Sequence, residues 1–389
     1  MKRASAGAAI LAATLLSFGG ARADGLATAP PLAWRVSTSA PSPAISAPGL
    51  EAIYDACGRP DDALVAVAGR NAGRLMRGEP GVAADELGFD VRAAGAPHVW
   101  PRAWSMEGEH LADDTVLAKV TKWASGASTL GERRCGVVRA TTRSGLEVVS
   151  AVQADVLADL DPLPTLARVG EWVSLRGHML VPASDAKVVL LGPRGAPKTV
   201  LASLSKDDVR ATFSVDKPGA WFVQVLATVS TGPRPVLEAW VFAGVDPPAK
   251  FEESPAPGED TSVGGLSTED ALLAMVNAAR ASEGLGALDR DATLDALALA
   301  HSELMVDTKT VGHDVGDGDP KTRLVDAGIS ATAIGENVAS AATLPRAHRA
   351  LWASPSHRGN LLEKRFKKMG VGVVTKADGR VWVTELFMN

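Results

Sequence analysis

Four segments in the first half of the chain recur in the same order about 230 residues later. RPDDALVAVAGRNAGRLM (59–76) resembles DRDATLDALALAHSELM (289–305), and VRAAGAPHVW resembles LVDAGISATA. Further along, KWASGAST corresponds to LWASPSHR, and RCGVVRATTRSGLEVVSAV corresponds to KMGVGVVTKADGRVWVTEL. An ordered repeat at a fixed distance is typical of a duplicated structural unit. We therefore predict that residues 45–160 and 267–389 share one fold.

The second copy shows helical and strand patterns in turn. STEDALLAMVNAARASEG and DATLDALALAHSELMVD predict two helices, the first with a Ser-Thr-Glu-Asp cap. Shorter helices are expected in DPKTRLVDAG and after Thr343, where Pro345 occupies the first turn. MGVGVVTKADGRVWVTELF predicts two strands around an Asp378-Gly379 turn. Helices packed on an antiparallel sheet predict an α+β domain in layers.

The region between the two copies has a different pattern of apolar and turn residues. Short runs of alternating apolar residues, separated by turn residues about every ten positions, predict an antiparallel β-sandwich (Ig-like) over residues 161–245. We see no cluster of ligand residues there, so a spacer or adhesion module is the favoured interpretation. The Pro-rich, acidic stretch 246–266 is typical of an interdomain linker.

The amino-terminal sequence indicates export. Residues 1–23 combine Lys2 and Arg3, an apolar run and an Ala-x-Ala end, which is the layout of a signal peptide. A Pro- and Ser-rich lead-in follows at 24–44. No later segment is long and apolar enough to cross a membrane, so we expect no transmembrane anchor after cleavage. The expected location is secreted, or periplasmic and cell envelope.

Charge and cysteine content narrow the functional classes. Removing residues 1–23 takes away three basic residues and changes the net charge from -5 to -8. Nucleic-acid binding needs clustered Lys and Arg, so we expect no nucleic-acid partner. The two cysteines, Cys57 and Cys135, are expected to form one disulfide, since the chain is exported. The alternative is a pair of buried free thiols.

Polar residues of the second copy are missing from the first. His301 corresponds to Ala72. In the same way, Glu336 falls near Ala103 and His357 corresponds to Ser128. The first copy is therefore predicted to be a structural element or a partner-binding surface. Both copies keep a tryptophan at the same place, Trp123 and Trp352, which favours a core role for both.

Three residues remain as candidates for chemistry. His313 in TVGHDVGDG, Glu336 in IGENVAS and His357 in SPSHRGN lie at loops or helix ends. Two imidazoles and a carboxylate are the ligand set of an open zinc site. The same groups could instead form a proton-transfer site. Their spacings of 23 and 21 residues match no local metal motif, so both interpretations remain open.

Five motifs of the second copy resemble a known family. AHSELM, GHDVGDG, AGISATAIGENVAS, LWASPSHRGNLLEKRFKKMGVGV and VWVTELF are similar, in this order, to motifs of the bacterial CAP superfamily. This family comprises cysteine-rich secretory, antigen 5 and pathogenesis-related 1 proteins, or SCP domains. The resemblance covers about residues 267–389. It implies an α-β-α sandwich (the CAP fold), with a cleft where His313, Glu336 and His357 converge. The first copy would then be a degenerate CAP-like α/β domain.

The match is not complete. Eukaryotic relatives have a second glutamate where this chain has Ala353-Ser354, and the usual Phe-Ser before the histidine is replaced by Val311-Gly312. Relatives are reported to bind divalent cations, sterols or other lipids.

The remaining polar residues receive these expectations. Asn337, Arg358 and Asn360 are candidate ligand contacts, with loop fixing as the alternative for Arg358 and Asn360. Glu385 is expected to face either the cleft or solvent. His301 is expected in the core. His348 is expected to be partly exposed on its helix, and surface or turn positions are expected for His98, His110 and His178.

These expectations combine into a binding protein. The chain is predicted to be a secreted or cell-envelope CAP-domain protein whose His/Glu/His cleft binds a divalent cation, with zinc as one candidate. The second ligand would be a lipid, a cell-wall glycan or a protein. A metal-dependent hydrolase using the same cleft and a structural or adhesive envelope protein are the alternatives, and we favour binding over catalysis.

Overall fold

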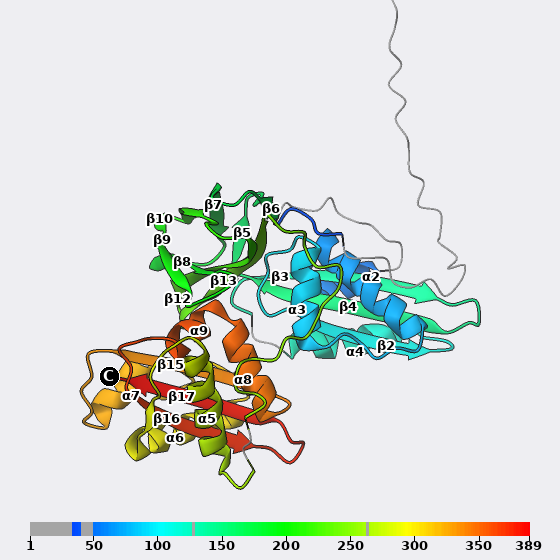
Figure 1. Ribbon diagram of the computed structural model, residues 1–389. Helices are drawn as coiled ribbons and strands as arrows, with labels where there is room; N and C mark the ends of the chain where they lie inside the picture. Colours follow the sequence, from blue (N-terminus) through cyan, green and yellow to red (C-terminus); the bar gives the residue numbers. More distant parts are fainter. Residues whose placement is uncertain (1–32, 40–49, 127–128, 262–263) are drawn as a thin grey trace, which may run out of the picture.

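The computed structural model describes residues 33–39, 50–126, 129–261 and 264–389. The predicted signal peptide, most of the lead-in and Ser128 lie outside these residues. The described chain forms three units packed against one another (Figure 1). No helix in the described part is long and apolar enough to cross a membrane.

The C-terminal unit (residues 268–389) has three layers. Its central sheet has the order β14-β16-β17-β15. Helices α6 and α7 cover one face, and α5, α8 and α9 cover the other. The elements are α5 Thr268–Ser282, β14 Asp289–Arg290, α6 Ala292–Thr308, α7 Pro320–Asp326, β15 Ile334–Ala341, α8 Leu344–Ala353, α9 Pro355–Leu361, β16 Lys368–Thr375 and β17 Val381–Met388.

Both faces of this sheet are buried, which explains the near-continuous apolar runs of its strands. On β17, Val383 and Phe387 pack toward α5 and α8, whereas Leu386 packs on Leu294 of α6. Helix α6 lies so close to β16 that a Cβ at Gly370 would clash with the backbone of Leu294. Glycine is therefore required at this crossing.

The N-terminal unit (residues 50–126 and 129–156) has the strand order β1-β3-β4-β2. In both units a two-residue first strand pairs in parallel with the third, and Asp61 and Asp291 cap the helix that follows. A Cβ at Gly136 would clash with the backbone of Leu64. The elements are α1 Glu51–Cys57, β1 Arg59–Pro60, α2 Asp62–Met76, α3 Ala84–Ala93, β2 Arg102–Gly108, α4 Asp113–Ser125, β3 Glu132–Thr141 and β4 Glu147–Val156.

The predicted disulfide is confirmed: Cys57, at the end of α1, is bonded to Cys135 on β3. Trp123 and Trp352 are partly buried and pack against the cores of their units.

The middle unit (residues 158–243) is a β-sandwich. Its sheets have the orders β10-β11-β7-β5 and β6-β13-β12-β8-β9 and share one apolar core around Trp221. Strand β12 is buried on both faces, because α9 packs on its outer side. The strands are β5 Ala158–Leu160, β6 Leu166–Ala167, β7 Trp172–Met179, β8 Asp185–Leu191, β9 Lys198–Leu201, β10 Ser203–Ser205, β11 Asp208–Ser214, β12 Gly219–Val229 and β13 Gly232–Ala243.

The stretch after the sandwich is attached to the C-terminal unit. Glu259 pairs with Arg349 of α8, and the ring of His348 bonds to the carbonyl of Pro257 at 2.9 Å. The expectation that His348 is partly exposed is therefore wrong. The linker covers it completely, and burial lowers its pKa.

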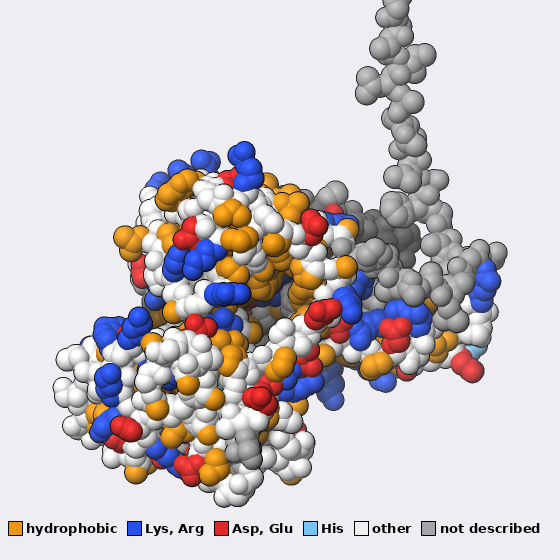
Figure 2. Space-filling model, viewed as in Figure 1, with side chains coloured by type: hydrophobic (Ala, Val, Ile, Leu, Met, Phe, Trp, Pro, Cys, Tyr) orange, Lys and Arg blue, Asp and Glu red, His pale blue; other side chains and the backbone are white. Residues whose placement is uncertain are grey.

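The predicted position of a second histidine is also wrong. His98 is buried, not at the surface, and its ring bonds to Asp61 at 3.1 Å. The cause is again a distant segment, because β13 bonds to the adjacent Pro97 carbonyl and covers this turn. His110 and His178 are exposed as expected. On the face shown in Figure 2, acidic and basic side chains are interspersed.

Candidate functional site

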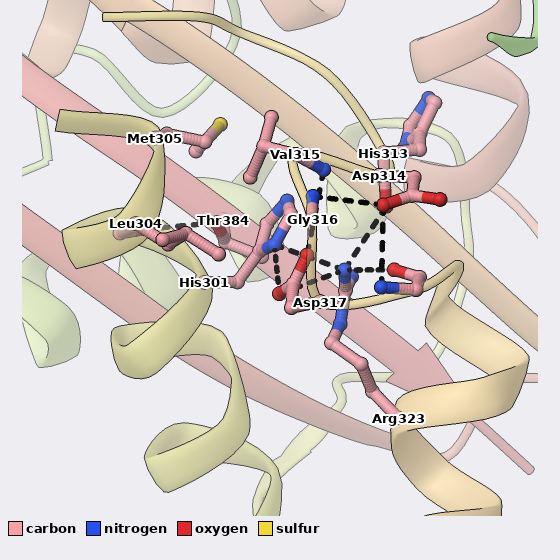
Figure 3. A network of polar contacts seen from close by, with 12 residues as sticks. His301, Leu304, Met305, His313, Asp314, Val315, Gly316, Asp317, Arg323 and Thr384 are labelled. Carbon is pink, nitrogen blue, oxygen red and sulfur yellow. Dashed lines mark hydrogen bonds and ion pairs between the residues drawn. The ribbon is translucent and has the colours of Figure 1, made fainter. Parts of the chain in front are cut away.

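A buried polar network lies beneath the loop that carries His313 (Figure 3). His301 of α6 is fully buried, as expected for a core histidine. Its Nε2 donates to the Gly312 carbonyl at 2.9 Å, and its Nδ1 lies 2.6 Å from the Asp317 carboxylate. The histidine therefore fixes both ends of the loop from Gly312 to Asp317 against α6.

Arg323 of α7 joins this loop to the sheet. Its Nη1 donates to the carbonyls of His313 and Gly318 at 3.0 and 2.9 Å. Its Nη2 pairs with the Glu336 carboxylate on β15. A buried guanidinium with this many acceptors holds the loop in one place.

Glu336 and His313 are in direct contact, as the sequence predicted. The Glu336 side chain is almost fully buried, and its Oε1 lies 2.9 Å from Nδ1 of His313. Since Oε2 is taken by Arg323, both carboxylate oxygens are bonded within the protein. The pairing at Nδ1 leaves Nε2 of the partly exposed His313 ring for another partner.

His357 lies in α9, and its carbonyl accepts from Asn337, the residue after Glu336 on β15, at 3.2 Å. Burial, together with the neighbouring His313, lowers the pKa of His357 to about 3. The imidazole is therefore neutral at physiological pH. No side chain in the described part of the chain bonds to this ring.

The three candidates are thus brought together only in part. His313 contacts Glu336, and the His357 backbone bonds to the adjacent Asn337, but Glu336 is engaged by Arg323. Within the described ranges, no group of three or more His, Cys, Asp or Glu side chains is arranged to hold a metal ion.

Residues 273–387 match the family model described as the cysteine-rich secretory protein family, CAP. The C-terminal unit matches this family over nearly its whole length, and we call it the CAP domain. The matched residues contain all three candidate residues and the whole four-stranded sheet except its last residue, Met388.

Relatives of the CAP domain come from several bacteria. An uncharacterised protein of Bacillus subtilis, YkwD, is 33% identical over 119 residues, which are 30% of this chain and 46% of that protein. The chain thus spans about half the length of this curated relative. An outer surface protein of Borrelia burgdorferi is 24% identical, with a TM-score of 0.30, over 31% of this chain and 92% of that one. An extracellular SCP-domain protein of Bacillus anthracis is 16% identical, with a TM-score of 0.29, over 59% of this chain and 88% of that one.

The three predicted ligand contacts of the CAP domain bond within the protein. Asn337 is fully buried and donates to the His357 carbonyl at 3.2 Å, while Asn360 donates to Asn337 at 2.9 Å. Arg358 lies over the Trp352 ring at 4.1 Å and donates to its carbonyl. These bonds fix α9 to β15 and α8, and contact with a ligand stays a prediction.

Sequence reasoning missed Arg323 and Asp317. Arg323 has the sequence context of a solvated residue in a short helix, yet it is buried. No local signal marked it, because Arg323 lies in the last turn of α7, where a cation suits the helix dipole and solvent exposure alike.

Glu385 of β17 is fully buried, so the solvent alternative is wrong. Its Oε2 accepts from Asn337 at 2.9 Å, and its Oε1 has no partner in the part of the chain that the structure describes. Burial raises the pKa of Glu385 to about 7, although the bond from Asn337 opposes the shift. The carboxyl is thus about half protonated near neutral pH.

Glu385→Gln is expected to remove a pH dependence of stability. The folded-state pKa lies above the ordinary value, so the folded protein retains a proton that the unfolded chain loses. Stability therefore falls as the pH rises from about 4.5 through 7, by about 3 kcal/mol in all. Urea unfolding at pH 5 and pH 8 would measure this. Relative to the wild type, Glu385→Gln should have the higher free energy of unfolding at pH 8. Glu303→Gln, at an exposed position, should show no such increase. An equal pH dependence in Glu385→Gln and wild type would contradict the expectation.

Two cavities lie away from the CAP site. A cavity of about 270 Å³ and one of about 480 Å³ both border the β-sandwich. The larger is lined by Leu130, Val181, Pro182, Ala183, Ser184, Thr228, Val229 and Ser230.

Proposed function

We propose that this protein is an exported CAP-domain protein whose His313 and His357 imidazoles bind a divalent cation. The supporting observation is that His313 and His357 are bonded to adjacent residues of β15, Glu336 and Asn337. Glu336 holds Nδ1 of His313, which leaves Nε2 for a ligand bond. His357 stays neutral because of burial, and a neutral imidazole is the form that binds metals.

The donor set suits zinc better than magnesium or calcium. Imidazole nitrogens favour zinc and related transition metals, whereas magnesium and calcium prefer oxygen ligands. Glu336 would act behind His313, as carboxylates commonly do behind metal-bound histidines. Direct ligation by Glu336 would require it to release Arg323. A bound zinc would supply a Lewis acid, and the residues named here orient the imidazoles.

The location and the second ligand are also part of the proposal. Residues 1–23 have the layout of a signal peptide, which supports secretion or a place in the cell envelope. The Bacillus anthracis relative is itself an extracellular protein. A lipid, a cell-wall glycan or a protein would be the ligand that meets the ion-binding site.

The N-terminal unit would be a degenerate CAP-like domain with a structural or partner-binding role. Its strand order equals that of the CAP domain, and its Gly136 crosses α2 as Gly370 crosses α6. The same glycines pair Leu64 with Leu294, so buried Asn71, and not Ala72 as the sequence suggested, stands where the CAP domain has His301. Ala103 stands in place of Glu336, because the strand partners of both residues lie opposite these glycines. These features support duplication followed by loss of part of the polar site.

Calorimetry with zinc tests the ion site. The wild type is expected to release heat on zinc binding, and His313→Ala and His357→Ala are expected to lose it. Glu336→Gln should bind about 10- to 100-fold more weakly, since it loses the group that orients His313. His178→Ala, an exposed histidine of the sandwich, is the matched control. Equal heats from all five proteins, or none from the wild type, would refute the ion site.

A further inference from the structure

A chain of buried polar contacts crosses all three units and ends next to His357. Arg92 of α3 pairs with Glu238 of β13. Glu238 accepts from Nε2 of Gln224 on β12 at 2.7 Å. Oε1 of Gln224, in turn, accepts from the backbone N–H of Ser356 in α9 at 3.3 Å. Gln224 is 1% exposed, so water does not compete for these bonds.

The charge of Glu238 determines how the Gln224 amide is oriented. A carboxylate only accepts hydrogen bonds, so the amide nitrogen of Gln224 must face Glu238 and its oxygen must face α9. Arg92 supplies the positive charge that balances Glu238. Burial lowers the pKa of Arg92 to about 10, which still leaves the guanidinium charged at neutral pH.

Helix α9 lacks a cap of its own. The Ser354 hydroxyl lies 3.2 Å from that of Ser356 but accepts from no backbone N–H of the first turn, and Pro355 has no N–H to donate. The N–H of Ser356 is therefore the first in this helix that needs an acceptor from outside. Gln224, about 130 residues earlier in the chain, provides it.

His357 is held from two sides as a result. Gln224 binds the residue before it, and Asn337 of β15 binds its carbonyl. One anchor belongs to the CAP domain and the other to the β-sandwich. The sandwich contacts α9 with both β12 and β8, so this is a packed interface and not a single bond.

We propose that the β-sandwich is part of the CAP site, with Gln224 as a positioning residue that fixes α9 and thereby the His357 imidazole. The consequence for ion binding rests on the proposed function. The positioning itself needs no bound ion. A sandwich that served only as a spacer would need neither a buried amide at this place nor the Arg92–Glu238 pair behind it.

Hydrogen exchange in the full-length protein tests this inference. Gln224→Met keeps the side-chain length but removes the acceptor. The amides of Ser356 and His357 should then exchange about fivefold faster, as expected for one lost hydrogen bond. Exchange in β16 and β17 should be unchanged. Thr212→Ala, on the exposed side of the other sandwich sheet, is the matched control and should match the wild type throughout.

Glu238→Gln provides a second variant, should Gln224→Met fail to fold. It keeps hydrogen-bonding groups at position 238 but removes the charge that orients Gln224, so α9 should again exchange faster. Unchanged exchange at Ser356 and His357 in a folded variant would overturn the inference, whether or not zinc binds. Zinc affinity should fall roughly tenfold in either variant. A wild type that binds no zinc would refute the proposed function alone.

Discussion

Arg323→Met is expected to destabilise the CAP domain by about 3–5 kcal/mol, the usual cost of breaking a buried ion pair. The substitution leaves Glu336 buried without its cationic partner. It also removes the donor that binds the carbonyls of His313 and Gly318. The loop that carries His313 should therefore loosen together with the sheet edge.

Native-state hydrogen exchange of β15 and β17 would measure this loss, because it reports the CAP domain separately from the other units. Lys321→Met, an exposed residue on the same helix, should change the exchange little. Adding Glu336→Met to Arg323→Met should restore part of the stability, since Glu336 is then no longer a buried charge without its cation. A loss below about 1 kcal/mol in Arg323→Met would show that the pair is not a structural support.

Cys57→Ser with Cys135→Ser is expected to destabilise the N-terminal unit by about 4 kcal/mol. The disulfide closes a sequence separation of 78 residues, and its removal increases the conformational entropy of the unfolded chain. Exchange in β3 and β4 should accelerate accordingly. Chemical reduction of the wild type should reproduce the effect.

The CAP domain serves as the internal control for this experiment, because it contains no cysteine. Exchange in α6 should remain unchanged in the double variant. An effect of equal size in both units would instead mean that the whole chain unfolds as one.

Most helices and the last two strands of the CAP domain could be predicted because their signals are local, whereas β15 was missed and Glu336 was expected at a loop or helix end. The helix cap at Ser267, the glycine after α7 and the Asp378-Gly379 turn each occupy a few consecutive residues. Helix α9 was missed for the same reason. Its seven residues begin at the proline of a Ser-Pro pair that is equally typical of a turn, and the bond to its first free N–H comes from the sandwich.

The histidines show which kind of burial a local sequence pattern cannot predict. His301 was predicted correctly because it lies on an apolar stripe of its own helix. His348 and His98 were predicted incorrectly because the segments that bury them, the linker and β13, lie about 90 residues or more away in sequence. Burial of this kind depends on docking between units, which no short pattern encodes.

The covered outer face of the sandwich limits how this protein can change during evolution. A sandwich that touches its neighbours only through short linkers could be replaced by another module during evolution. In this chain, β12 is covered by α9, and α3 packs on the adjacent β13. The two outer units and the sandwich between them must therefore accept mutations together. Replacing one unit alone with an unrelated module would leave an apolar sheet exposed to water.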